Sequence, residues 1–162
     1  MIYIFIIVFI AAGEYLIKNY IEAKFQKGDR EEILGGKIIL HKYYNKGAML
    51  NFMDNKKEIV KTISAVFLGL VLLLFAIMLP KKGNRLYKLG LALILGGAIS
   101  NVTDRYLRGY VVDYFSFNTK FKKLKTIVFN LADIAIFIGS LFLMLSSILS
   151  AVFQGSSDKS AE

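Results

Sequence analysis

The sequence contains no cysteine and a single histidine, His41, among its 162 residues. Without cysteine the chain can form no disulfide, no thiolate nucleophile, and no zinc or iron–sulfur site built on cysteine. His41 has no acidic neighbour at catalytic spacing, so serine triads and histidine-based metal sites lack essential groups. Neither a GxxxxGK[ST] loop nor a GxGxxG fingerprint occurs. We therefore expect no metal and no cofactor.

Hydrophobic residues are abundant and are massed in long runs. They make up 56% of the chain, and the mean hydropathy is +0.53. A soluble domain is typically about 45–50% apolar, with the apolar residues dispersed. The formal net charge is +9, and basic residues that flank apolar runs attract anionic lipid headgroups. Because no nucleic-acid-binding motif is present, we expect membrane lipids, and no nucleic acid, as partners.

Four apolar segments are long enough to cross a bilayer: about residues 1–18, 60–80, 86–104 and 127–150. A helix of ~20 apolar residues spans the ~30 Å hydrocarbon core. Backbone groups must be hydrogen-bonded internally in lipid, so these segments predict an all-α membrane protein, a four-transmembrane-helix bundle. No Lys or Arg precedes the first segment, which favours an uncleaved span over a signal peptide. The glycine pair within Leu95–Ser100 predicts close helix packing.

The polar segment between the first two spans, about residues 19–60, predicts a small β-rich cap on the extracytoplasmic face. Within it, Lys37–Tyr44 (KIILHKYY) has the composition of a β-strand. We expect one integral membrane domain, residues 1–153, followed by a disordered tail, residues 154–162.

The orientation in the membrane is predicted from the basic loops. Residues Lys81–Lys88 carry four basic residues and no acidic one, which predicts that this loop and both termini are cytoplasmic. The basic cluster Lys120–Lys125 argues against that orientation. We predict a multi-pass protein of the bacterial cytoplasmic membrane with both termini inside.

Polar side chains gather near the ends of the third and fourth apolar segments. The spacing i, i+3, i+4 and i+7 places Asn101, Asp104, Arg105 and Arg108 on one helical face. Asp133 interrupts a segment that is otherwise apolar, three residues after an asparagine. A carboxylate facing lipid there costs about 2.5–3.5 kcal/mol. We therefore expect Asp133 to face the bundle interior.

Two buried acids, Asp113 and Asp133, indicate a possible reaction. If the two carboxyl groups lie close together, they share one proton. The ionised member then takes a proton from water, while the protonated member polarises a scissile carbonyl. The residue types alone leave an alternative equally open, in which Asp113 caps a helix or forms an ion pair with Arg105 or Arg108.

Five patches of the sequence match, in order, the motifs of a known family. EYLIK (Glu14–Lys18) resembles DQxxK, and NKGA (Asn45–Ala48) resembles NxGA. GGAISNVTDR (Gly96–Arg105) resembles GGAxGNxxDR. VVDYF (Val111–Phe115) resembles VVDF, and FNLADIAI (Phe129–Ile136) resembles FNxADxxI. The chain thus resembles the lipoprotein signal peptidases, also called signal peptidase II.

The resemblance implies an intramembrane aspartic peptidase that removes signal peptides from prolipoproteins. It implies cleavage on the amino side of a diacylglyceryl-modified cysteine, by a monomer. Asp113 and Asp133 would form the catalytic dyad. The further residues implied are those that bind substrate, namely Asn101, Arg105, Asn130, Asn45 and Gly47, and those that give structural support, namely Asp104 (steadying Arg105), Lys18 and Glu14.

Three departures from the family pattern stand outside the implied dyad. Glu14 replaces Asp, Ser100 replaces Gly, and Met49–Phe52 (MLNF) replaces a run of small residues. Because the dyad itself is intact, we expect an active enzyme. The alternative is a non-catalytic four-span subunit in which Asp133 and Arg105 form a buried structural pair. A channel is disfavoured, because its polar residues would extend through the full depth of the membrane.

Overall fold

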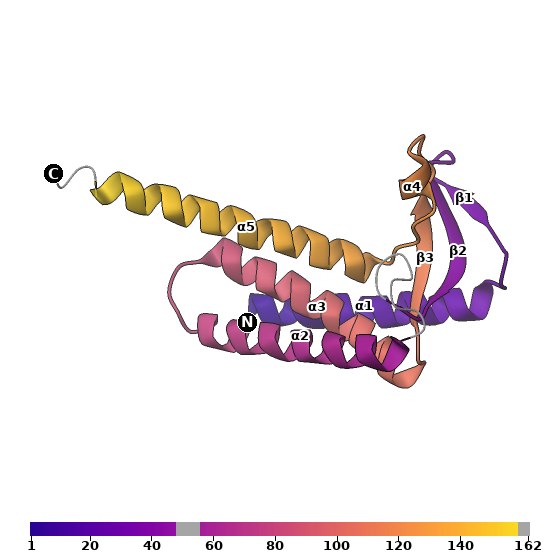
Figure 1. The fold of residues 1–162 in the computed structure, drawn as a ribbon, viewed down its shortest axis with the longest axis horizontal. Helices are drawn as coiled ribbons and strands as arrows, with labels where there is room; N and C mark the ends of the chain where they lie inside the picture. Colours follow the sequence, from indigo (N-terminus) through magenta and orange to yellow (C-terminus); the bar gives the residue numbers. More distant parts are fainter. Residues whose placement is uncertain (48–55, 159–162) are drawn as a thin grey trace.

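Long helices and a small sheet at one end of them make up the fold (Figure 1). A computed structural model describes residues 1–47 and 56–158, and side chains as far as residue 152. The helices that are long and apolar enough to cross a membrane are α1 (Ile2–Lys24), α2 (Lys57–Met78), α3 (Arg85–Leu107) and α5 (Leu131–Asp158). The predicted four-span helical bundle is confirmed. The departure at Met49–Phe52 lies outside the described residues.

Helix α3 is the centre of the bundle. It packs against α1, α2 and α5, and it contributes Leu91, Ala92, Ile94 and Leu95 to the main apolar core. The outer faces of the other helices carry large exposed apolar side chains, such as Phe9. In water such a surface would be unfavourable, whereas lipid tails cover it without cost.

Glycines allow α3 to approach its neighbours closely. A Cβ atom on Gly97 would lie 2.5 Å from the Ala132 carbonyl oxygen, and one on Gly90 would lie 2.8 Å from the Gly139 oxygen. A Cβ on Gly96 would meet Ile10 at 2.8 Å. These contacts confirm the close packing predicted from the glycine pair.

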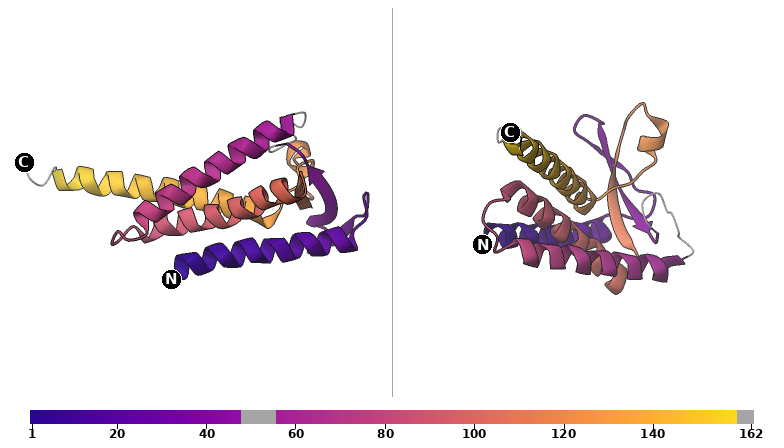
Figure 2. Two further views of the ribbon diagram at one scale, coloured as in Figure 1. Left: turned by 90° about the horizontal axis from the view of Figure 1, so that it is seen from below. Right: turned by 60° about the vertical axis from the view of Figure 1, so that its left-hand side comes forward.

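The sheet has the order β1–β2–β3 and is antiparallel throughout. Its strands are β1 (Glu31–Ile33), β2 (Ile38–Asn45) and β3 (Val111–Phe117). The strands run across the ends of the helices, and the sheet extends sideways past α5 (Figures 1 and 2). This sheet is the predicted β-rich cap, and β2 is the strand predicted at Lys37–Tyr44.

The cap draws on more of the chain than the segment 19–60. Strand β3 follows α3 directly, through Gly109, whose positive φ of 79° permits the sharp turn. It pairs with β2 along its length, and a short helix, α4 (Lys122–Lys125), follows it. The long loop therefore supplies only part of the cap.

Two helix boundaries differ from the sequence expectation. Helix α5 begins at Leu131 rather than near residue 127, because the preceding Phe129 bridges to Phe115 in β3. At its other end α5 continues to Asp158, so the predicted disordered tail is helical from residue 154 to residue 158. Residues 159–162 of that tail lie outside the described residues.

Candidate active site

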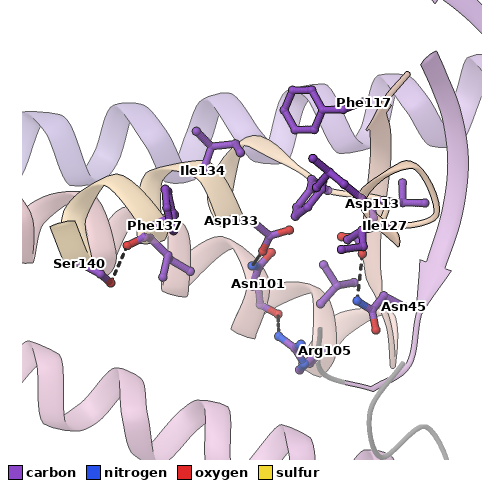
Figure 3. A pocket seen from close by; sticks show the side chains of 15 residues that line it. Asn45, Asn101, Arg105, Asp113, Phe117, Ile127, Asp133, Ile134, Phe137 and Ser140 are labelled. Carbon is purple, nitrogen blue, oxygen red and sulfur yellow. Dashed lines mark hydrogen bonds between the residues drawn. The ribbon is translucent and has the colours of Figure 1, made fainter. Parts of the chain in front are cut away.

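The two acids singled out in the sequence lie at the junction of the cap and the bundle. Asp113 is in the middle of β3 and is 2% exposed. Asp133 is in the first turn of α5. Both acids line one cavity (Figure 3). Both also form a hydrogen bond with a single residue, Asn130. The sequence alone had not shown whether the two acids lie close together.

Asn130 organises the site by capping helix α5. Its Oδ1 accepts a hydrogen bond from the Asp133 backbone N–H at 2.9 Å, and its own backbone N–H donates to Asp133 Oδ2 at 3.2 Å. This reciprocal pair is a capping box. The Asn130 side-chain amide then donates to Asp113 Oδ1 at 2.7 Å. One residue thus orients both carboxylates.

Side-chain amides from two other parts of the chain, Asn130 and Asn45, donate to Asp113. In addition to Asn130, the side chain of Asn45 at the end of β2 donates to Asp113 Oδ2 at 2.9 Å. The register places Tyr43 opposite Asp113 and Asn45 opposite Val111, so the bond is a diagonal cross-strand contact. Burial, and next the charge of Asp133, raises the pKa of Asp113 to about 7.

Asp133 accepts one more amide, from α3. The Asn101 side chain donates to Asp133 Oδ1 at 2.9 Å, and its own Oδ1 accepts from the Asn130 amide at 3.2 Å. The ion pairs of the described residues include neither Asp113 nor Asp133. The alternatives that paired these acids with arginine for a structural purpose are therefore wrong in this geometry.

Arg105 lies on the other side of the cavity and contacts the chain that leaves β2. Its guanidinium donates to the backbone oxygens of Gly47 at 3.1 Å and Asn101 at 3.2 Å. The Gly47 N–H in turn donates to Asn45 Oδ1 at 3.1 Å. The Nε of Arg105 is buried and has no hydrogen-bond partner among the described residues. An unpaired buried donor at a cavity wall is suited to an incoming carbonyl oxygen.

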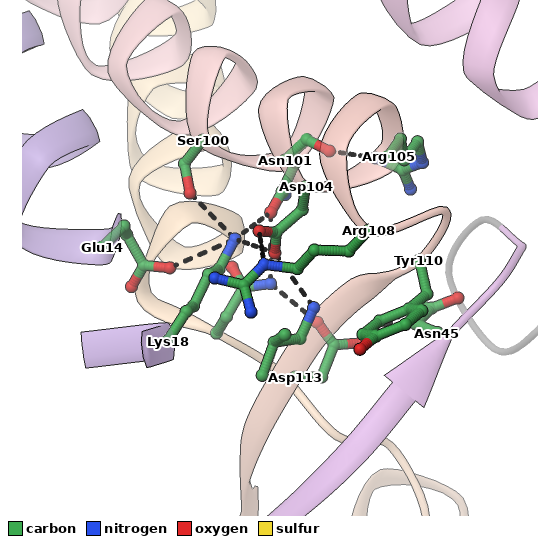
Figure 4. Close-up of polar contacts among 12 residues, drawn as sticks. Glu14, Lys18, Asn45, Ser100, Asn101, Asp104, Arg105, Arg108, Tyr110 and Asp113 are labelled. Carbon is green, nitrogen blue, oxygen red and sulfur yellow. Dashed lines mark hydrogen bonds and ion pairs between the residues drawn. The ribbon is translucent and has the colours of Figure 1, made fainter. Parts of the chain in front are cut away.

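Lys18 is completely buried and contacts polar side chains of α1 and α3 (Figure 4). Its ammonium group lies 2.8 Å from Ser100 Oγ, 3.0 Å from Asn101 Oδ1, 3.1 Å from Asp104 and 3.5 Å from Glu14. Two hydrogen bonds connect it to Asp133, because the Asn101 side chain accepts from Lys18 and donates to Asp133. Ser100, which replaces a glycine of the family motif, thus supplies a ligand to this lysine.

Asp104 has direct partners other than Arg105. It forms ion pairs with Lys18 and with Arg108, the latter at 2.9 Å, and it accepts the Val112 backbone N–H at 3.0 Å. The described ion pairs do not join it to Arg105. The carboxylate of Asp104 points toward α1 and β3, so the expected support of Arg105 involves no direct ion pair among the described residues and stays a prediction. The carboxylate anchors the start of β3.

Tyr114 was not among the predicted site residues. Its hydroxyl donates to Glu14 Oε1 at 2.6 Å and accepts the Leu131 backbone N–H at 3.1 Å. Glu14 Oε1 also accepts the Leu131 N–H, at 3.1 Å. Burial, and next the charge of Glu14, raises the pKa of Tyr114. The signal in the sequence was the tyrosine of VVDYF. Tyr114 and Glu14 together bind the first residue of α5, two positions before Asp133.

The cavity has a volume of about 630 Å³ and is largely apolar. Its charged residues and asparagines are at one end, and the remaining wall, which includes Ser140 at the far end, runs along α5 and the segment before it (Figure 3). The apolar residues that line it include Phe117, Leu124, Ile127, Phe129, Ile134 and Phe137. The sequence did not predict this wall, because apolar residues there are indistinguishable from lipid-facing ones.

Four membrane spans, with two carboxylates bound to one asparagine at one end of an apolar cavity, define a membrane-embedded protein whose cavity carries groups suited to acid–base chemistry. Comparisons with known proteins identify the family. The family model described as signal peptidase (SPase) II matches residues 5–149. The chain therefore belongs to the signal peptidase II family, a family of proteases, as its motifs predicted.

Individual relatives and solved structures agree with this assignment. A lipoprotein signal peptidase of Shouchella clausii is 33% identical over 160 residues, covering 98% of this chain and 97% of that protein. One of Lactobacillus johnsonii is 30% identical, covering 89% and 90%. A solved structure described as a bacterial membrane enzyme superposes with a TM-score of 0.75 at 24% identity, covering 97% of this chain and 90% of that one. That structure shows the same fold.

Proposed function

We propose that this protein removes signal peptides from prolipoproteins by hydrolysing a peptide bond with Asp113 and Asp133. The observation that carries the proposal is that two carboxylates from different elements are bonded to one asparagine at the polar end of an apolar cavity. Membership of the signal peptidase II family, and relatives named lipoprotein signal peptidase, supply the substrate class.

The two acids take different parts in the reaction. Asp133 accepts hydrogen bonds from the Asn101 side chain on α3 and from the Asn130 backbone N–H that caps α5, and we assign it the role of the base. Asp113, whose pKa is raised to about 7, carries the shared proton. Asp133 takes a proton from water as the water oxygen adds to the scissile carbonyl carbon. Asp113 gives its proton to the carbonyl oxygen, which forms a diol. The diol collapses as Asp113 takes a proton back from one hydroxyl, the C–N bond breaks, and Asp133 gives its proton to the leaving nitrogen, which restores the dyad.

The rest of the cavity positions the substrate. The apolar wall along α5 takes the hydrophobic part of a prolipoprotein, whose cysteine carries a diacylglyceryl group, and cleavage falls on the amino side of that cysteine. Arg105 Nε and the Asn45–Gly47 turn lie where the substrate backbone passes. Holding the bond beside the dyad supplies much of the catalysis.

The residues all come from one chain, so we expect a monomer, with its cap outside and both termini in the cytoplasm.

The test is cleavage of a synthetic diacylated lipopeptide by the full-length protein in lipid nanodiscs. Asp113→Asn and Asp133→Asn are each expected to lower the rate by about 10²–10⁴-fold or more. Asp29→Asn, which alters an exposed carboxylate in the cap, is the matched control and should cleave normally. Retained cleavage by either dyad variant would refute the dyad.

A further inference from the structure

A lysine-rich segment beside the cavity has no part in the chemistry above. It comprises Lys120, Phe121 and helix α4 (Lys122–Lys125), and we call it the lysine segment. It contains four lysines, and no acidic residue occurs between Asp113 and Asp133. The described ion pairs include none of these lysines, and all of them are exposed.

Apolar side chains are interleaved with these charges. Phe121 is 74% exposed, and Leu124 is 37% exposed while it also lines the cavity. A large aromatic side chain held in water between lysines is unfavourable for a solvated surface. The same pattern is favourable at a lipid interface, where the apolar groups enter the acyl region and the lysines reach the headgroups.

The position of the lysine segment in the fold fits such an interface. In Figures 1 and 2, α4 lies at the end of the sheet that extends past α5, on the side from which the helices leave. It is therefore displaced sideways from the bundle and faces the plane in which lipid surrounds α5. The segment is also fixed to the sheet, because Asn118 donates to the backbone oxygens of Lys37 and Gly36.

We propose that the lysine segment docks onto anionic phospholipid headgroups and holds the cap against the membrane at the rim of the cavity. Each lysine that reaches the surface of an anionic membrane strengthens binding by about fivefold. This role also explains why a basic cluster lies on the cap side of the membrane. The orientation predicted from the basic loops alone does not explain that position. An acidic peptide would be attracted by the same charges but would leave Phe121 in water.

The chain offers a clean probe, because it contains no tryptophan. A Phe121→Trp variant of the full chain, reconstituted in vesicles, reports on its surroundings by emission wavelength and by quenching with phosphatidylcholine brominated near the headgroup. In vesicles of equimolar phosphatidylcholine and phosphatidylglycerol, we expect the emission to shift to the blue and the quenching to increase relative to phosphatidylcholine alone. High salt should reverse both changes.

Charge-matched pairs of substitutions in the Phe121→Trp background separate specific docking from general attraction. Lys122→Gln with Lys123→Gln is expected to lower the docking equilibrium by about 25-fold, which removes the blue shift. Lys27→Gln with Arg30→Gln removes the same charge from exposed positions near β1 and should keep it. Adding Asp113→Asn should leave docking unchanged, so the result is independent of peptidase activity.

Three results would overturn the proposal. The first is equal emission in the two kinds of vesicle. The second is equal loss of the blue shift in both pairs of substitutions. The third is a blue shift that appears only when an acidic lipopeptide is added, irrespective of phosphatidylglycerol, which would make the lysine segment a substrate contact instead.

Discussion

Replacing Asp113 by asparagine should change the pH dependence of stability as well as abolish catalysis. The ordinary pKa of this carboxyl is 3.8, and burial raises it to about 7 in the folded protein. When the pH rises from about 4 to about 7, Asp113 therefore ionises in the unfolded chain before it does so in the folded one. The free energy of unfolding falls over this window and levels off above it.

The size of the effect follows from the two pKa values. Each pH unit between them is worth about 1.4 kcal/mol, so the loss in the wild type amounts to up to about 4 kcal/mol. Asp113→Asn removes this contribution. The variant also replaces one acceptor oxygen by an NH₂ group facing Asn45 or Asn130, which costs about 1–3 kcal/mol at every pH. The variant is thus expected to be less stable than the wild type near pH 4.5 and as stable or more stable above pH 7.

The measurement is thermal unfolding followed by circular dichroism, in one detergent and at one scan rate, from pH 4.5 to pH 8. Across this range the wild type loses about 3 kcal/mol of the contribution, because the measurement starts at pH 4.5. For a chain of this size 1 kcal/mol corresponds to about 2–4 °C, so the Tm of the variant relative to wild type should rise by up to roughly 6–12 °C across the range. Asp29→Asn is the exposed control and should show no such trend. A Tm difference for Asp113→Asn that is constant with pH, or that falls, would refute the reasoning.

Three further predictions concern the surroundings of the dyad. Lys18→Met should lower the free energy of unfolding by about 3–5 kcal/mol, as measured by chemical denaturation, because it leaves the buried Glu14 carboxylate without its cation and removes one of the two cations of Asp104. Tyr114→Phe should lower it by about 1–3 kcal/mol in the same assay, since a buried acceptor loses its donor and the N-terminus of α5 loses a ligand. Gly97→Ala should reduce the cleavage rate and the Tm together, because its Cβ would lie 2.5 Å from the Ala132 oxygen; Gly69→Ala, with nothing within 4 Å, should be neutral in both measurements.

The sequence predicted the bundle well because lipid imposes a simple rule on it. Each long apolar segment became a helix, since no other structure satisfies its backbone in the hydrocarbon core. The helix ends were less accurate. The apolar residues Ile127, Val128 and Phe129 continue the hydrophobic run, but Phe129 pairs with β3, and the helix begins only after Asn130. The capping pair of Asn130 and Asp133 was the local signal for that start.

Strand β3 escaped prediction because it is buried on both faces. Residues Val111–Ser116 are all buried, so the strand lacks the alternation of polar and apolar residues that marks a half-exposed strand. The partners of Lys18 and Asp104 were beyond reach for another reason. The residues that meet these side chains lie up to 86 positions away from Lys18, and only the packing of α1 against α3 decides which groups meet.

The division of the two acids between a strand and a helix has a consequence for biogenesis. Asp113 reaches its partner only when β3 has paired with β2, and Asp133 only when α5 has been capped by Asn130. A nascent chain whose spans have entered the bilayer one after another, but whose sheet is still unpaired, holds these carboxylates apart. In the proposed mechanism, proteolytic competence therefore requires the paired sheet and the capped helix as well as the inserted spans.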